Sequence, residues 1–125
     1  MKIVISHCNK YDFLNELYIP IKKDYKLSSH NIYLPEENRA VNTKEIIKNC
    51  DIVIAEVSYP ATGQGIELGW ADYADKPIYC IHKTGSKYAS SLKFITSEFY
   101  SYSSEKELVD VINKIIELHD VKMKY

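Results

Sequence analysis

The chain has 125 residues, 46% of them hydrophobic, and a formal net charge of −1. This length suits a single domain over residues 1–125, and the interspersed charges, without a basic stripe, argue against nucleic-acid binding. No secretory leader or membrane-length apolar run is recognisable, so we expect a cytoplasmic protein that does not bind a membrane. The three cysteines are widely spaced, which favours reduced thiols over disulfides.

Apolar runs alternate with helical periodicities along the chain, which predicts one α/β domain with a parallel sheet. Right-handed crossovers favour a three-layer arrangement with five strands in the flavodoxin-like order 2-1-3-4-5. The expected strands are residues 2–6, 31–34, 52–57, 76–82 and 98–102. The expected helices are residues 12–24, 42–49, 65–71, 92–95 and 104–120. We expect Pro20 to bend the first helix near Leu17, and the end of the chain, residues 121–125, to fray.

The first strand leads into a polar loop, residues 7–10, at the edge of the sheet where its strands end. His7 in this loop could act as a general acid, a phosphate donor or a metal ligand. A simple hydrogen-bonding role is the favoured interpretation, and whether His7 takes part in chemistry stays open.

The central stretch, residues 51–69, combines a buried strand, a turn-rich loop and a short helix. Glu67 is expected in the first turn of that helix, where an acid can either complement the helix dipole or serve chemistry in a partly dry cleft. Gly63 and Gly65 could permit close approach of a ligand or supply positive φ to the turn. Their spacing to Gly69 fits neither the dinucleotide fingerprint nor a P-loop.

Two further loops begin at the carboxyl ends of strands, on the same side of the sheet as Glu67. Glu36, Glu37 and Arg39 could overhang it, although a solvated charge cluster is the favoured interpretation. Serine hydroxyls and lysines after the fourth strand, together with a helix amino terminus, could hold a phosphate, the alternative being a solvated loop with a serine cap. The hydroxyl groups concerned belong to Ser86, Ser90 and Ser91.

The segments 55–60, 63–71 and 76–78 resemble the signature of the nucleoside 2-deoxyribosyltransferase superfamily, and most closely its small branch of 2'-deoxynucleoside 5'-monophosphate N-glycosidases. The resemblance is strongest over residues 51–95. It implies a homodimer or larger oligomer, no cofactor and no metal, and cleavage of the N-glycosidic bond of a deoxynucleoside or its monophosphate.

The resemblance also implies residue roles. The nucleophilic glutamate of the family falls on Glu67, where a carboxylate can capture an oxocarbenium-like sugar carbon. A phosphate-binding serine from the neighbouring subunit falls on Ser91, and a second one falls on Ala61, with Thr62 beside it as a substitute. The expected substrate-binding residues are therefore His7, Tyr59, Thr62, Gly63, Gly65 and Ser91.

The sequence departs from the family pattern at two places. The second catalytic acid of the family falls on Thr43, and His7 stands where a small residue is usual. The first strand and its loop weakly resemble TIR-like domains, which cleave NAD by means of a glutamate. The alternatives to a glycosidase through Glu67 are therefore a nucleotide-binding or sensing module with little turnover, and a TIR-like NAD glycohydrolase.

Overall fold

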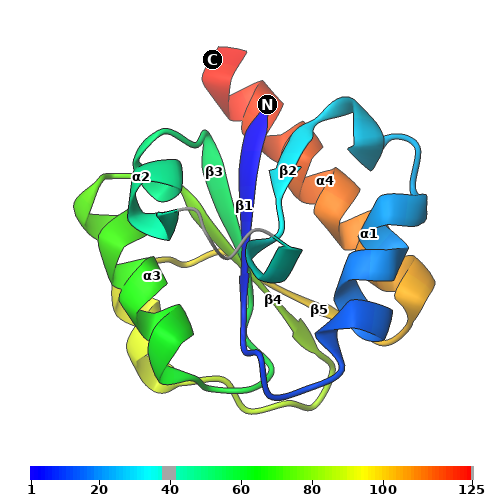
Figure 1. The fold of residues 1–125 in the computed structure, drawn as a ribbon, viewed down its shortest axis with the longest axis horizontal. Coiled ribbons are helices and arrows are strands. Elements are labelled where there is room, and N and C mark those ends of the chain that lie inside the picture. The colour runs from blue at the N-terminus through cyan, green and yellow to red at the C-terminus, as the bar shows by residue number, and fades with distance from the viewer. Residues whose placement is uncertain (38–41, 125) are drawn as a thin grey trace.

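The computed structural model of the chain describes residues 1–37 and 42–124, which form one α/β domain (Figure 1). Its sheet has five parallel strands in the order β2-β1-β3-β4-β5, which confirms the predicted topology. The strands are β1 (Lys2–His7), β2 (Asn31–Tyr33), β3 (Ile52–Glu56), β4 (Ile78–Lys83) and β5 (Phe99–Tyr102). Because all the strands are parallel, their carboxyl ends lie at one edge of the sheet.

Helices cover both faces of the sheet, as a view along its plane shows (Figure 1). On one face lie α1 (Ile19–Lys23) and α4 (Glu105–Lys124), and on the other lie α2 (Thr43–Lys48) and α3 (Thr62–Tyr73). Short connecting turns complete the chain: a π-helical turn at Leu14–Tyr18 and 3-10 turns at Leu27–Ser29, Pro35–Glu37 and Ser90–Phe94.

Alternate residues of the buried strands fill two separate cores, since side chains of a strand point to opposite faces. Ile3, Ile5 and Ile54 belong to the core on the α1 and α4 side. Val4 and Val53 belong to the core on the α2 and α3 side. The same alternation directs neighbouring polar residues at the strand ends to different sides of the molecule.

Several helix predictions are confirmed by capping contacts. The Asn42 side chain accepts a hydrogen bond from the Lys44 backbone N–H (3.1 Å), so it caps α2. The Ser104 hydroxyl accepts from the Glu107 N–H (3.2 Å) and the Glu107 carboxylate accepts from the Ser103 N–H (3.0 Å), which fixes the start of α4.

Other element predictions need correction. The predicted first helix is a π-helical turn at Leu14–Tyr18 followed directly by α1, so the predicted irregularity near Leu17 lies within this turn, before Pro20. The predicted helix at 92–95 is only a 3-10 turn, Ser90–Phe94. The predicted fraying of residues 121–125 is wrong for residues 121–124. There α4 continues to Lys124, and Lys122 pairs with Glu98 at 2.7 Å.

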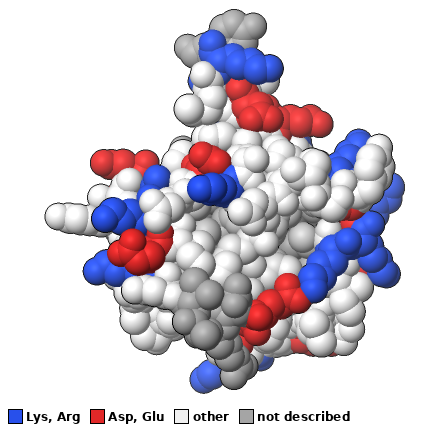
Figure 2. All heavy atoms as spheres, turned by 45° about the horizontal axis from the view of Figure 1, so that its top comes forward, with Lys and Arg blue, Asp and Glu red and all other residues white. Residues whose placement is uncertain are grey.

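Within the described residues, no helix is long and apolar enough to cross a membrane. Lysine side chains and acidic side chains both occur on the face seen in Figure 2. Arg39, which the sequence placed near the edge of the sheet, lies outside the described residues.

Candidate active site

The helix α3 begins directly at the carboxyl end of the sheet and carries Glu67 there. It starts at Thr62, three residues before the predicted start at Gly65. Gly63 therefore lies inside the helix and not in a loop, and Glu67 lies in the second turn, not the first. Neither glycine has positive φ, and a Cβ added at either would meet no atom within 4 Å. The prediction that these glycines could supply positive φ to a turn is therefore wrong.

Gln64 fixes the start of α3 against the sheet. Its buried side-chain amide donates to the backbone carbonyls of Glu56 (2.8 Å) and Ser6 (3.2 Å), which lie at the carboxyl ends of β3 and β1. These bonds satisfy carbonyl groups at strand ends and hold the helix at a defined position above β1 and β3.

Among the described residues, one serine of the sheet donates a side-chain hydrogen bond to Glu67. The buried Ser6 hydroxyl donates to Glu67 Oε1 at 2.9 Å. Burial raises the pKa of the Glu67 carboxyl above its usual value, the Ser6 hydrogen bond opposes this shift, and the negative charge of Glu36 adds to it. The arrangement thus keeps a partly desolvated carboxylate in a fixed orientation.

Two open cavities meet around the first turn of α3. The one that contains Glu67 has a volume of about 160 Å³. It is lined by residues from the ends of β1 and β2 and from α3: His7, Asn9, Pro35, Glu36, Ala61, Gly63, Gln64 and Glu67. The second cavity, of about 600 Å³, shares Asn9, Ala61, Gly63 and Gln64 with the first. Together they form one recess large enough for a small organic molecule.

Most of the predicted substrate-binding residues line this recess. His7 and Gly63 line the smaller cavity, and Thr62, Gly65 and Ser91 line the larger one. The predicted site residues from three separate segments of the chain are therefore brought together at the carboxyl edge of the sheet.

Tyr59 points instead toward the side of α1. Its ring lies 4.8 Å from that of Tyr11, and its hydroxyl accepts a hydrogen bond from Lys83 Nζ at 2.8 Å. The structure thus separates Tyr59 from the recess that contains Glu67.

His7 is the last residue of β1 and is buried, not part of a polar loop as predicted. Its Nδ1 lies 2.9 Å from the Cys8 carbonyl and its Nε2 lies 2.6 Å from the Tyr18 hydroxyl. A carbonyl only accepts, so Nδ1 carries the proton and Nε2 accepts from Tyr18. Burial lowers the pKa of His7, which favours this neutral form with both ring nitrogens bonded.

Sequence reasoning missed three polar residues around Glu67. Ser6 and Gln64 were not singled out, although a serine at the end of an apolar strand and a glutamine between two glycines are local signals. Glu36 was assigned to a solvated cluster, which is wrong, because it is half-buried and lines the cavity of Glu67. Within residues 1–37 and 42–124, no group of three or more His, Cys, Asp or Glu side chains could hold a metal ion.

No protein-family model matches the sequence, and no curated protein sequence matches it. Solved structures do match the fold. A CMP N-glycosidase from Clostridium botulinum, BcmB, superposes with a TM-score of 0.62 at 20% identity, covering 90% of this chain and 99% of that one. A 2-deoxyribosyltransferase from Bacillus psychrosaccharolyticus superposes with a TM-score of 0.60 at 20% identity, covering 87% of this chain and 90% of that one. The resemblance to the nucleoside 2-deoxyribosyltransferase superfamily is thus confirmed at the level of the fold.

Proposed function

We propose that this protein cleaves the N-glycosidic bond of a deoxynucleoside or deoxynucleoside monophosphate, with Glu67 as the nucleophile. The sugar is then released to water or transferred to a second base. The observation that carries the proposal is the Glu67 carboxylate, bonded by Ser6 through Oε1 and exposed to a cavity at the carboxyl edge of the sheet. The fold shared with an N-glycosidase and a deoxyribosyltransferase supports the same class of reaction.

The chemistry follows from the environment of Glu67. As the bond from C1′ to the base nitrogen weakens, the sugar acquires oxocarbenium character. Its positive charge would stabilise the ionised form of Glu67, which burial otherwise disfavours. A bond from Glu67 to C1′ then forms while the electron pair of the broken bond leaves with the base. Attack by water on this intermediate releases the sugar, and attack by a second base transfers it.

The larger cavity provides room for the rest of a nucleotide. Thr62 at the amino terminus of α3 and Ser91 both line it, and helix amino termini favour anions. We propose that these two hydroxyls of one chain contact the 5′-phosphate when a monophosphate is the substrate, so that Ser91 acts in its own subunit and not, as the resemblance implies, from the neighbouring one.

Ser91→Ala tests the phosphate contact. We expect the KM for a deoxynucleoside monophosphate to rise about tenfold, because a hydrogen bond to a charged group is lost, while the KM for the matching nucleoside stays unchanged. Ser86→Ala is the control, since the Ser86 hydroxyl donates to the Lys83 carbonyl at 2.7 Å. An equal rise for nucleoside and monophosphate would contradict the assignment.

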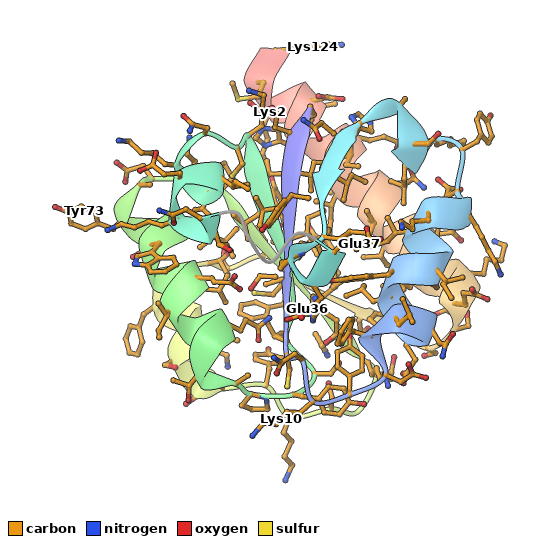
Figure 3. The ribbon with its side chains drawn as sticks, viewed as in Figure 1. Lys2, Lys10, Glu36, Glu37, Tyr73 and Lys124 are labelled. Atoms are coloured by element: carbon orange, nitrogen blue, oxygen red, sulfur yellow. The ribbon has the colours of Figure 1, made fainter. Side chains whose placement is uncertain are left out.

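An apolar stripe on α3 supports a homodimer as the active form. Tyr73 is 92% exposed and Ile66 is 50% exposed, and Figure 3 shows Tyr73 pointing away from the body of the domain. Light scattering would measure the mass in solution.

The three cysteines are all unpaired and buried, which supports a reducing, cytoplasmic location.

The second candidate function is a nucleotide-binding module with little turnover. It is favoured by Thr43, the first residue of α2, which stands where the resemblance implies the second catalytic acid. A TIR-like NAD glycohydrolase is the third candidate. The products formed from a panel of substrates separate all three.

The test is a chromatographic assay for free base after incubation with deoxynucleosides, their monophosphates and NAD. We expect release by the wild-type protein and about a thousandfold loss, or more, in Glu67→Gln, because the amide is a very weak nucleophile. Glu117→Gln, an exposed position on α4, is the matched control and should keep full activity. Ligand binding without release by the wild type would favour the binding module, and release from NAD alone would favour the glycohydrolase.

A further inference from the structure

A second carboxylate lines the cavity that contains Glu67. Glu36 belongs to the 3-10 turn Pro35–Glu37, which begins two residues after the end of β2. In Figure 3 it lies in front of the sheet, whereas Glu37 lies on the side of α1. Two adjacent glutamates therefore have different surroundings: Glu36 is half-buried in the recess, and Glu37 is exposed and pairs with Lys22.

The backbone of Glu36 is fixed by buried groups. Its N–H donates to the Tyr18 hydroxyl at 3.0 Å, and the same hydroxyl donates to His7 Nε2. Tyr18 is 1% exposed, so the turn is tied to the core and not only to the surface. This relay explains why an acid in a charged segment reaches the recess.

Glu36 also affects Glu67 electrostatically. The charge of Glu36 is one of the causes that raise the pKa of Glu67. Glycosidases commonly use two carboxyl groups at one site, one as the nucleophile and the other as the group that exchanges a proton with the leaving group.

We propose that Glu36 exchanges the proton with the leaving base, in place of the acid that the family pattern would put at Thr43. This inference rests on the proposed function and adds a second catalytic residue to it. The other titratable group that lines the smaller cavity, His7, already uses both ring nitrogens in bonds to Cys8 and Tyr18.

The two half-reactions balance. In the first, Glu67 bonds to C1′, the bond from C1′ to nitrogen breaks, and the base takes the electron pair together with the Glu36 proton. In the second, the oxygen of a water molecule bonds to C1′, Glu36 takes one water proton, and the ester electron pair returns to Glu67. Glu36 is then again protonated and Glu67 again ionised, and the net reaction is hydrolysis.

The experiment compares Glu36→Gln with Glu37→Gln on two substrates. One is the nucleoside or nucleotide that the wild type cleaves fastest, whose base needs a proton to leave. The other is the 4-nitrophenyl glycoside of the same sugar, whose leaving group needs none. We expect Glu36→Gln to lower kcat about a hundredfold on the first substrate and less than about threefold on the second, since general acid catalysis contributes this much.

Glu37→Gln should leave both rates unchanged, because Glu37 faces Lys22 at the surface. The retained cleavage of the nitrophenyl glycoside by Glu36→Gln shows in the same assay that the variant is folded. An equal loss on both substrates, or no loss on either, would overturn the role of Glu36 and leave that of Glu67 standing. A wild-type protein that releases no base would overturn the proposed function itself, and this inference with it.

Discussion

Glu56 and Glu67 show two opposite treatments of an acid at the same edge of the sheet. Glu56, the last residue of β3, is 1% exposed and accepts from the Ser58 N–H (2.7 Å), the Ser58 hydroxyl (2.9 Å) and the Tyr102 hydroxyl. Glu67, on the α3 side, is half-buried, accepts from Ser6 and faces a cavity. Burial alone therefore does not identify a reactive acid, since Glu56 is more buried than Glu67 and has its hydrogen-bond donors in place.

The pleat of β1 produces the same division between Ser6 and His7. These neighbours point to opposite faces of the sheet. His7 is enclosed by Tyr18 and Phe13, with ring centroids 5.2 and 4.7 Å away, whereas Ser6 reaches Glu67 beside the recess. On the α1 side, His7 and Glu56 thus have hydrogen-bond partners within the domain, whereas on the α3 side Glu67 faces the recess.

Glu56→Gln should have the largest effect on stability. The amide nitrogen that replaces one carboxylate oxygen cannot accept, so at least one buried donor from Ser58 or Tyr102 loses its partner. We expect the free energy of unfolding to fall by about 2 kcal/mol, which denaturant titration measures. An unchanged midpoint would show that the hydrogen-bonded cluster around Glu56 is not structural.

Glu67→Gln provides the contrast, with the opposite sign. The folded pKa of Glu67 is raised, so the unfolded chain ionises more readily and the ionised form costs stability at neutral pH. The melting temperature of Glu67→Gln should therefore exceed that of the wild type at pH 7. The difference should shrink as the pH falls below the pKa of an unfolded glutamate, where both states are protonated. A lower melting temperature at pH 7 would contradict this reasoning.

The fold was predictable because each strand and helix carries a local signal. Continuous apolar runs mark β1 and β3, and capping residues mark α2 and α4. The sheet order then follows from handedness, not from any single residue. Glu67 could be singled out in the same way, because it is an acid in an otherwise apolar helix.

The start of α3 was not predictable from local propensity. Glycines at positions 63 and 65 disfavour a helix, and the predicted helix began only at Gly65. The helix forms there because Gln64 between them bonds to the carbonyl groups of Ser6 and Glu56, residues that are 58 and 8 positions away in the chain. Tertiary hydrogen bonds outweigh the propensity, and such contacts leave no periodic pattern in a sequence.

Glu36 and His7 were misjudged for the same reason. Both depend on the Tyr18 hydroxyl, which bonds to the Glu36 N–H and to His7 Nε2 from a different part of the chain. A charged segment and a polar strand end therefore appeared solvated in the sequence. Only the packing of the π-helical turn against the sheet brings these three residues together.

Ser6→Ala and Ser58→Ala should have the smallest effects, because each removes only one hydroxyl that donates to an acid. The Ser6 bond lowers the pKa of Glu67, so its loss raises that pKa and should move the acidic limb of kcat/KM to higher pH. The plateau rate should fall less than about tenfold, as expected for one hydrogen bond. Ser58→Ala should lower stability by about 1 kcal/mol and leave the acidic limb in place, because its carboxylate partner is Glu56 and not Glu67. If both variants shifted the limb equally, the two sides of the edge would be electrostatically coupled, and the distinction between a structural and a reactive carboxylate would fail.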